Sequence, residues 1–159
     1  MPNMSKAGLD AEQRRFIDDL SALLTPWGMP LSLARVYGYL LLRSLPVSLD
    51  DIAADLEMSK SSASVAARDL ERNALARRHG ERGSKRVFYA VSDNYAGFLL
   101  DRTRMLGNLG KLMQGRANAV TSGAAARRMK DRARAYLKLR DATEAAIEEI
   151  AAETTRGKR

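Results

Sequence analysis

Hydrophobic residues in the first part of the chain recur at helical spacing. Within and just after residues 10–24, four apolar side chains follow one another at intervals of four, three and four: Phe16, Leu20, Leu23 and Trp27. This spacing is typical of an amphipathic helix with a narrow apolar seam. Two prolines and a glycine in residues 25–30 end that helix. Residues 31–44 are apolar almost all round, which predicts a second helix at the centre of a core.

The next segment carries the signals of a short, capped helix. Residues 45–47 are too few for anything but a turn or a one-bridge strand. Ser48 followed by Asp51 fits an N-cap with an acidic residue at its third position. Apolar residues then recur at i, i+3, i+4 and i+7, which predicts a helix ending near residue 57.

A third helix and a hairpin follow almost without a break. Ser59 is placed to cap a helix running to about residue 72, and Asn73 is expected to end it in the left-handed conformation. Residues 74–80 and 86–91 read as two strands joined by a polar, glycine-containing loop. A helix, a turn, a second helix and a basic hairpin occur in the order of a winged helix-turn-helix. The predicted fold class is therefore mainly α with a small β-hairpin wing.

Beyond residue 92 the hydrophobic period changes to seven. The apolar pairs are Phe98-Leu99, Met105-Leu106, Leu112-Met113 and Ala119-Val120. A period of seven predicts coiled-coil packing against another helix, and the interrupting glycines indicate either close helix approach or a kink. Residues 121–123 separate this helix from a final one at about 124–152. An antiparallel bundle within one chain would satisfy the seam, but we favour a homodimer. The predicted dimer contacts are Phe16, Leu20, Leu23, Tyr95, Leu99, Leu106, Leu109 and Met113.

Positive charge is concentrated in the predicted third helix and hairpin. The 159-residue chain has a formal charge of +8, yet residues 1–58 carry a net −3 and residues 59–90 a net +5. Such localisation favours a polyanionic partner, and nucleic acid before a membrane surface.

Other classes of function lack their usual residues. The chain has no cysteine and one histidine, His79, and we find no phosphate-binding or dinucleotide-binding glycine-rich loop. We therefore expect no enzyme, no cofactor and no metal site. No apolar run approaches ~20 residues and no signal-peptide pattern opens the chain, so we expect a soluble, cytoplasmic protein.

The helix at residues 59–73 has the pattern of a DNA-reading helix. Its inward stripe is made of alanines and a leucine, whereas small hydroxyls and long basic side chains lie on the opposite arc. A slim outward face with hydrogen-bonding groups suits the major groove. A basic hairpin tip suits the backbone or the minor groove. For each residue alone a capping or solvated role is the plain alternative. The predicted DNA contacts are Lys60, Ser61, Ser62, Ser64, Val65, Arg68, Arg77, Arg82, Lys85 and Arg86.

Residues 28–91 resemble the winged-helix core of the MarR superfamily, and most closely its GbsR/MarR-type regulators. The resemblance is carried by GMP before ARVYGYLLL, then LDDIAADLEMSKSSAS, LERNALARR and GSKRVFYAV. It departs at Asn73-Ala74, where such proteins usually place a glycine. The resemblance implies an obligate homodimer that reads a pseudo-palindromic operator in double-stranded DNA, with the terminal helices as the dimer module. It also implies that some members respond to a small molecule.

These observations together predict three segments and one leading function. Residues 1–30 contribute a helix to the dimer module, residues 31–91 form the DNA-binding domain, and residues 92–159 complete the dimer module. We expect a homodimeric, sequence-specific transcriptional regulator that represses by occupying its site. Trp27, Tyr37 and Tyr95 form a candidate effector pocket for a cation, although core packing is the alternative for each ring.

A second class of function rests on the final helix. It would make the protein a sequence-nonspecific architectural DNA-binding or protein-interaction module that binds through basic residues of this helix: Arg127, Arg128, Lys130, Arg132 and Arg134.

Overall fold

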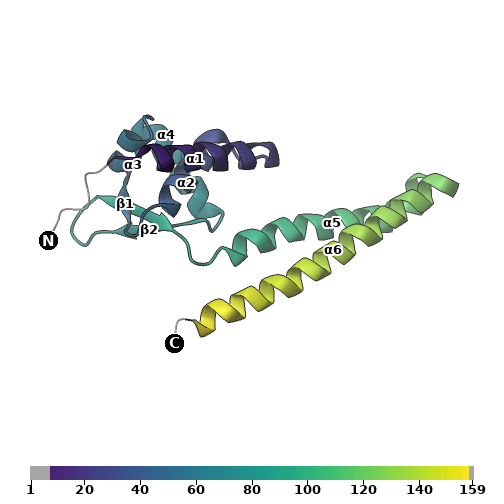
Figure 1. The fold of residues 1–159 in the computed structure, drawn as a ribbon. Coiled ribbons are helices and arrows are strands. Elements are labelled where there is room, and N and C mark those ends of the chain that lie inside the picture. The colour runs from purple at the N-terminus through teal and green to yellow at the C-terminus, as the bar shows by residue number, and fades with distance from the viewer. Residues whose placement is uncertain (1–7, 158–159) are drawn as a thin grey trace. The chain divides into compact units, whose positions relative to one another are not determined.

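The computed structural model describes residues 8–157, and the chain divides into two compact units. The first unit ends at Asp93 and the second begins at Asn94. In the described residues the first unit contains four α-helices, one 3₁₀ turn and three strands, and the second contains two long helices (Figure 1).

The first unit is a winged helix-turn-helix, as the sequence predicts. Its elements are α1 (Ala11–Leu24), the 3₁₀ turn η1 (Thr25–Trp27), α2 (Leu31–Leu41), β1 (Val47–Ser48), α3 (Leu49–Asp55), α4 (Lys60–Arg72), β2 (Ala76–Gly80) and β3 (Val87–Val91). The three strands form an antiparallel sheet in the order β1-β3-β2. The short β1 thus joins the edge of the β2–β3 hairpin.

Helix α2 lies at the centre of this unit, because α1, α4 and β3 all pack against it. Gly38 allows the close approach of α1: a Cβ there would lie 3.2 Å from Leu20 Cδ2 and 3.4 Å from Ile17 Cγ1. The core that results is made largely of α2 and α4 side chains, which are Leu33, Ala34, Val36, Tyr39 and Leu40 on α2 and Ala63, Ala66, Ala67 and Leu70 on α4.

Helix α1 turns only part of its apolar surface toward α2. Ile17 and Ser21 are buried, and the Ser21 hydroxyl is satisfied by donating to Ile17 O at 2.7 Å. Leu20 is half-buried, whereas Phe16 and Leu23 retain 41% and 70% exposure. Much of the seam that the spacing predicts is therefore left uncovered by α2.

The end of α4 differs from the sequence-based expectation. Asn73 has a φ of −92°, and the left-handed residue is Ala74, with a φ of +59°. Both the backbone N–H and the Nδ2 of Asn73 donate to Asp69 O, at 3.1 and 2.7 Å. These bonds keep Asn73 close to helical geometry and move the chain reversal one residue on. For an alanine this conformation costs about 1–2 kcal/mol.

The second unit is an antiparallel helical hairpin of α5 (Ala96–Val120) and α6 (Gly123–Arg156). The buried residues of α5 are small, namely Thr103, Gly107, Gly110 and Ala117. A Cβ at Gly107 would lie 2.7 Å from Arg140 Cδ, and one at Gly110 would lie 2.8 Å from Leu137 Cγ. These two glycines thus permit close helix approach rather than a kink.

Packing on the small residues leaves four of the large apolar side chains of α5 exposed. Met105, Leu109, Leu112 and Val120 are 61%, 37%, 63% and 59% exposed. Leu106 and Met113, the second members of their heptad pairs, are half-buried beside α6. In two of the four heptad pairs, therefore, one member is half-buried and the other is exposed.

We expect Gly110→Ala to lower the free energy of unfolding by about 1 kcal/mol. Overpacking against Leu137 and Ala133 O costs about 1–3 kcal/mol, and the gain in helix propensity offsets about 1 kcal/mol of that. Urea unfolding followed by circular dichroism measures the change. Gly115→Ala is the matched control, since nothing lies within 4 Å of its added Cβ, and it should stabilise the protein. Equal shifts for both variants would contradict close packing at Gly110.

Candidate nucleic-acid interface

The N-terminus of α4 is built by three serines. The Ser59 Oγ accepts the Ser62 N–H at 3.1 Å and caps the helix. Its oxygen also lies 2.8 Å from Ser62 Oγ and 3.1 Å from Ser61 Oγ. All three side chains are exposed. The first turn therefore presents hydroxyl groups together with the positive end of the helix dipole, which attracts phosphate.

Helix α4 has two faces that differ in bulk. Its alanine face is fully packed: Ala63, Ala66 and Ala67 retain at most 2% exposure. The opposite face presents Ser61 and Ser64, and Val65 beside them is 52% exposed. Arg68 is exposed on the same side, and its Nε donates to Ser64 O at 3.3 Å, so its side chain lies back toward the helix N-terminus.

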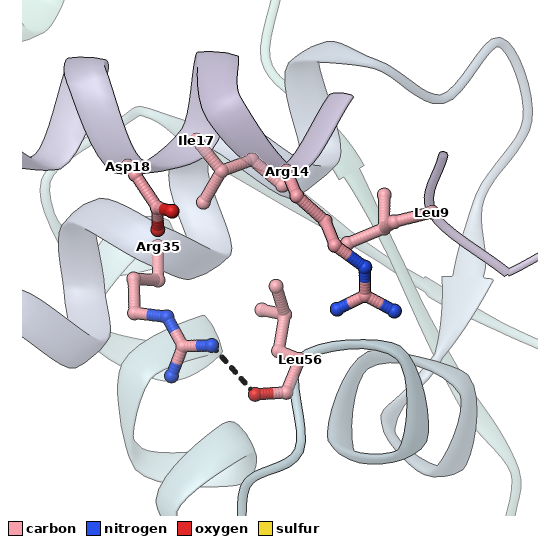
Figure 2. Close-up of a pocket in the computed structure, with 6 residues that line it drawn as sticks. All are labelled: Leu9, Arg14, Ile17, Asp18, Arg35 and Leu56. Atoms are coloured by element: carbon pink, nitrogen blue, oxygen red, sulfur yellow. Dashed lines mark hydrogen bonds between the residues drawn. The ribbon is translucent and has the colours of Figure 1, made fainter. Parts of the chain in front are cut away.

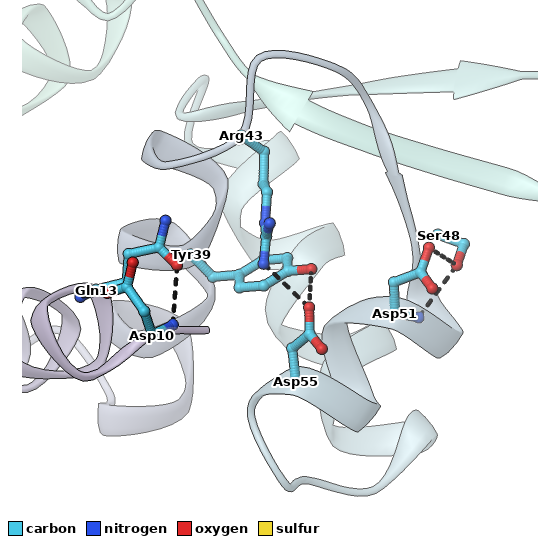
Figure 3. Close-up of polar contacts among 7 residues, drawn as sticks. All are labelled: Asp10, Gln13, Tyr39, Arg43, Ser48, Asp51 and Asp55. Atoms are coloured by element: carbon cyan, nitrogen blue, oxygen red, sulfur yellow. Dashed lines mark hydrogen bonds and ion pairs between the residues drawn. The ribbon is translucent and has the colours of Figure 1, made fainter. Parts of the chain in front are cut away.

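Side chains of α2, together with Arg43 just after it, hold the turn that positions α4. Arg35 Nη2 donates to Leu56 O, just past α3, at 2.7 Å. Asp55 accepts the Tyr39 hydroxyl at 2.7 Å and pairs with Arg43 Nη2 at 3.0 Å (Figure 3). The Arg43 guanidinium also lies over the Tyr39 ring, 4.5 Å from its centroid. Burial raises the pKa of Tyr39, and its hydrogen bond to Asp55 raises it further.

The turn between α3 and α4 is tight and strained. Glu57 has a φ of +52°, and the Met58 N–H donates to Ala53 O at 3.0 Å. Lys60, in the first turn of α4, pairs with Asp50 of α3 at 2.9 Å, and both side chains are exposed. A phosphate at the start of α4 would compete with Asp50 for this ammonium group.

The loop between β2 and β3 carries the predicted wing contacts. Arg82, Lys85 and Arg86 are all exposed. Gly83 turns the chain with a φ of +77°, and the Arg86 N–H donates to Ser84 Oγ at 3.0 Å. The Arg86 guanidinium lies 5.5 Å from the centre of the Phe88 ring, which gives this side chain a defined place at the base of the loop.

The register of the β2–β3 ladder separates two adjacent arginines. Arg78 is opposite Tyr89 and Arg77 is opposite Ala90, so the two point to different faces of the sheet. Burial raises the pKa of Tyr89, Glu71 adds to the rise, and Arg78 and Arg68 oppose it. Arg78 therefore shares the face of the sheet that carries Tyr89, and its strand β2 packs against α4. The predicted contact Arg77 lies on the opposite face of the sheet. Its neighbour Ala76 is an apolar residue and is buried, and this alternation indicates which positions of β2 share the face of Tyr89.

The predicted dimer contacts fall into two groups by exposure. Phe16, Leu23, Tyr95 and Leu109 are exposed, and Leu20, Leu99, Leu106 and Met113 are half-buried. The predicted dimer contacts do not include Met105 and Leu112, the two most exposed apolar residues in the middle of α5. Both belong to heptad pairs, and only the packing of α5 on α6 shows which member of these two pairs remains exposed.

The aromatic residues predicted to form an effector pocket differ in their surroundings. Trp27 is 83% exposed on η1 and Tyr95 is 43% exposed at the start of the second unit. Tyr37 is half-buried on α2, and its burial raises its pKa. The pocket described below has a different lining, so the aromatic pocket stays a prediction.

The basic part of α6 is exposed as well. Arg127, Arg128, Arg132 and Arg134 are exposed, Lys130 is half-buried, and Arg134 pairs with Asp131. Across residues 8–157, no group of three or more acidic or histidine side chains is arranged to hold a metal ion. Nor does any helix of that part of the chain have the length and apolarity needed to cross a membrane.

Comparison with known proteins supports the fold. No protein-family model matches the sequence, and no curated protein matches it. A solved structure described as a transcriptional regulator superposes with a TM-score of 0.73 at 18% sequence identity. The match covers 89% of this chain and 99% of that protein. The chain therefore shares the fold of that regulator over nearly the whole of its length.

We expect Tyr39→Phe to destabilise the protein by about 1.5–3 kcal/mol, because the hydroxyl donates to a charged, half-buried carboxylate. Tyr37→Phe, on the same helix, is the control and should change stability by less than about 0.5 kcal/mol. Thermal and urea unfolding of both variants check this. Equal stability of the two variants would show that the bond to Asp55 does not hold the turn.

Proposed function

We propose that this protein is a homodimeric, sequence-specific DNA-binding transcriptional regulator, and that it represses by occupying its site. The observation that carries the proposal is the slim, exposed face of α4. Its hydroxyl-bearing first turn is followed by Val65 and Arg68, while its alanine face is buried. Serine and arginine are suited to base edges, and valine to the thymine methyl group.

The wing supplies the sequence-independent part of binding. Arg82, Lys85 and Arg86 contact the backbone or the minor groove, and Arg78 adds positive charge beside α4. Lys60 contacts a phosphate in place of Asp50. Because each neutralised phosphate releases counterions, affinity falls as salt rises. The net charge of +5 on residues 59–90 supports this electrostatic role.

Two uncovered apolar surfaces support dimerisation, one on α1 and one on α5. The surface on α5, formed by Met105, Leu109, Leu112 and Val120, has the periodicity of a helix contact. Charge on α6 supports an antiparallel second copy. Residues 127–140 carry seven basic and one acidic side chain, and residues 141–156 carry five acidic and one basic. Two antiparallel copies would set opposite charges beside one another.

Two copies of the first unit would read two half-sites about one helical turn, 10–10.5 bp, apart. Selection of bound sequences from random DNA tests this directly. A pseudo-palindromic consensus with that spacing is expected. Recovery of no consensus would favour the architectural alternative, in which the exposed basic residues of α6 bind DNA without sequence preference.

We expect Arg68→Ala to lower affinity for the selected site by about 1–3 kcal/mol and to relax preference at one position per half-site. The double change Arg82→Ala and Lys85→Ala should weaken binding to all sequences and make the salt dependence shallower by about one unit of slope per lost phosphate contact. Fluorescence anisotropy at several salt concentrations measures both. Arg127→Ala with Arg128→Ala is the matched control on α6, and loss of binding there alone would reverse the assignment.

We expect Leu109→Glu with Leu112→Glu to convert a dimer to a monomer, because charged groups would have to be buried in the dimer contact. Light scattering coupled to size-exclusion chromatography measures the mass. The control is Asn108→Glu, which adds charge at an exposed polar position of the same helix. A monomeric unmodified protein, or an unchanged mass in the double variant, contradicts the proposed dimer surface.

A further inference from the structure

A small pocket lies beside the turn that positions α4. It has a volume of about 150 Å³ and lies between α1, α2 and the residue that follows α3. Its lining combines three apolar side chains, two guanidinium groups and one carboxylate: Leu9, Ile17, Leu56, Arg14, Arg35 and Asp18 (Figure 2). None of the aromatic residues considered for an effector lines it.

The charged groups of this pocket are open to a ligand. Arg14 and Asp18 are four residues apart on α1, so they lie on one helix face, and both are exposed. Within residues 8–157, neither forms an ion pair. Arg35 is half-buried at the other side and uses Nη2 to hold Leu56 O. The pocket thus sets two positive groups and one negative group around an apolar floor.

The volume limits the size of the ligand. At about 150 Å³, the pocket is smaller than a typical small-molecule site. Drug-sized ligands need about 300 Å³ or more. A small carboxylate alone would leave Asp18 repelling it, and a small amine alone would face two arginines. A ligand with both charges and an aliphatic body matches all six lining residues.

We propose that this pocket binds a free aliphatic α-amino acid. The carboxylate of the ligand pairs with Arg14 and Arg35, which are suited to bidentate contact. Its ammonium group faces Asp18, and its side chain covers Leu9, Ile17 and Leu56. This site is separate from the predicted aromatic pocket and takes a zwitterion rather than a cation.

Arg35 connects the pocket to the turn before α4. A ligand carboxylate competes with Leu56 O for the Arg35 guanidinium, and Leu56 precedes the strained Glu57. Binding therefore loosens the contact that fixes the start of α4 and weakens DNA binding. This regulatory step rests on the proposed DNA-binding function, whereas the binding of the amino acid does not.

The test of the pocket uses the full chain without DNA. Isothermal titration calorimetry with L-valine, L-leucine and L-isoleucine should show saturable binding in the range of about 0.1–10 mM for at least one of them. For L-leucine the matched fragments are 4-methylpentanoate, which lacks the amino group, and 3-methylbutylamine, which lacks the carboxylate. Both should bind about tenfold or more weakly than the amino acid. No saturable binding of any amino acid, or equal binding of either fragment, overturns the proposal.

Variants locate the site. Arg14→Gln and Asp18→Asn change exposed residues that, within residues 8–157, form no ion pair with the turn, and each should weaken amino-acid binding about tenfold or more. Arg15→Gln changes an exposed residue of the same helix that does not line the pocket, and it should leave the affinity unchanged. Binding that survives both pocket variants overturns the assignment to this pocket.

The regulatory step is tested separately, by measuring the affinity for the selected DNA site with and without the amino acid. Saturating amino acid should raise the dissociation constant for DNA about threefold or more, and Asp18→Asn should remove this response. If the amino acid binds but DNA affinity does not change, the competition at Arg35 is wrong while the pocket stands. If no DNA site is found but the amino acid binds as described, the proposed function fails and the pocket stands.

Discussion

The hydrogen bonds that fix the end of α3 are the interaction on which the rest of the first unit depends. Arg35 and Tyr39 of α2, with Arg43 just after it, converge on Asp55 and the Leu56 carbonyl. The bonds satisfy a helix C-terminus and orient a half-buried carboxylate, whose loss of hydration would otherwise be costly. Because α4 begins four residues after Leu56, fixing this end fixes where the exposed face of α4 points.

The alanine stripe of α4 follows from the same constraint. Along its first two turns this helix packs on α2 and α3 through small side chains, and Ala63, Ala66 and Ala67 are buried almost completely; the larger Leu70 is buried near its end. Large side chains in the core are supplied instead by α2 and α3, on which Tyr39, Leu40 and Ile52 are fully buried. The outward face is then free to carry serines. These contribute little to a core and, in the proposed function, suit the major groove of DNA.

The sequence predicts features that depend on neighbouring residues and misses those that depend on contacts far along the chain. Ser48 and Ser59 cap as expected, because a cap involves only the next three residues. The bond between Tyr39 and Asp55 joins residues 16 apart, and no local pattern reveals it. On α5 the large apolar pairs recur every seven residues, yet the residues that are buried against α6 are the small ones. The spacing of Gly107 and Gly110 was the available signal.

Basic charge by itself does not distinguish the two surfaces that could meet DNA. The N-terminal half of α6 is about as basic as the segment around α4, and both are exposed. What separates them is shape and hydrogen-bonding capacity. The basic residues of α6 occur at nearly every position around the helix and are followed by an acidic half, whereas α4 presents hydroxyls and one arginine on a single slim face beside a wing. Both surfaces would attract phosphates, and the proposed function assigns base recognition to the second because hydroxyls and a guanidinium on a slim face suit base edges.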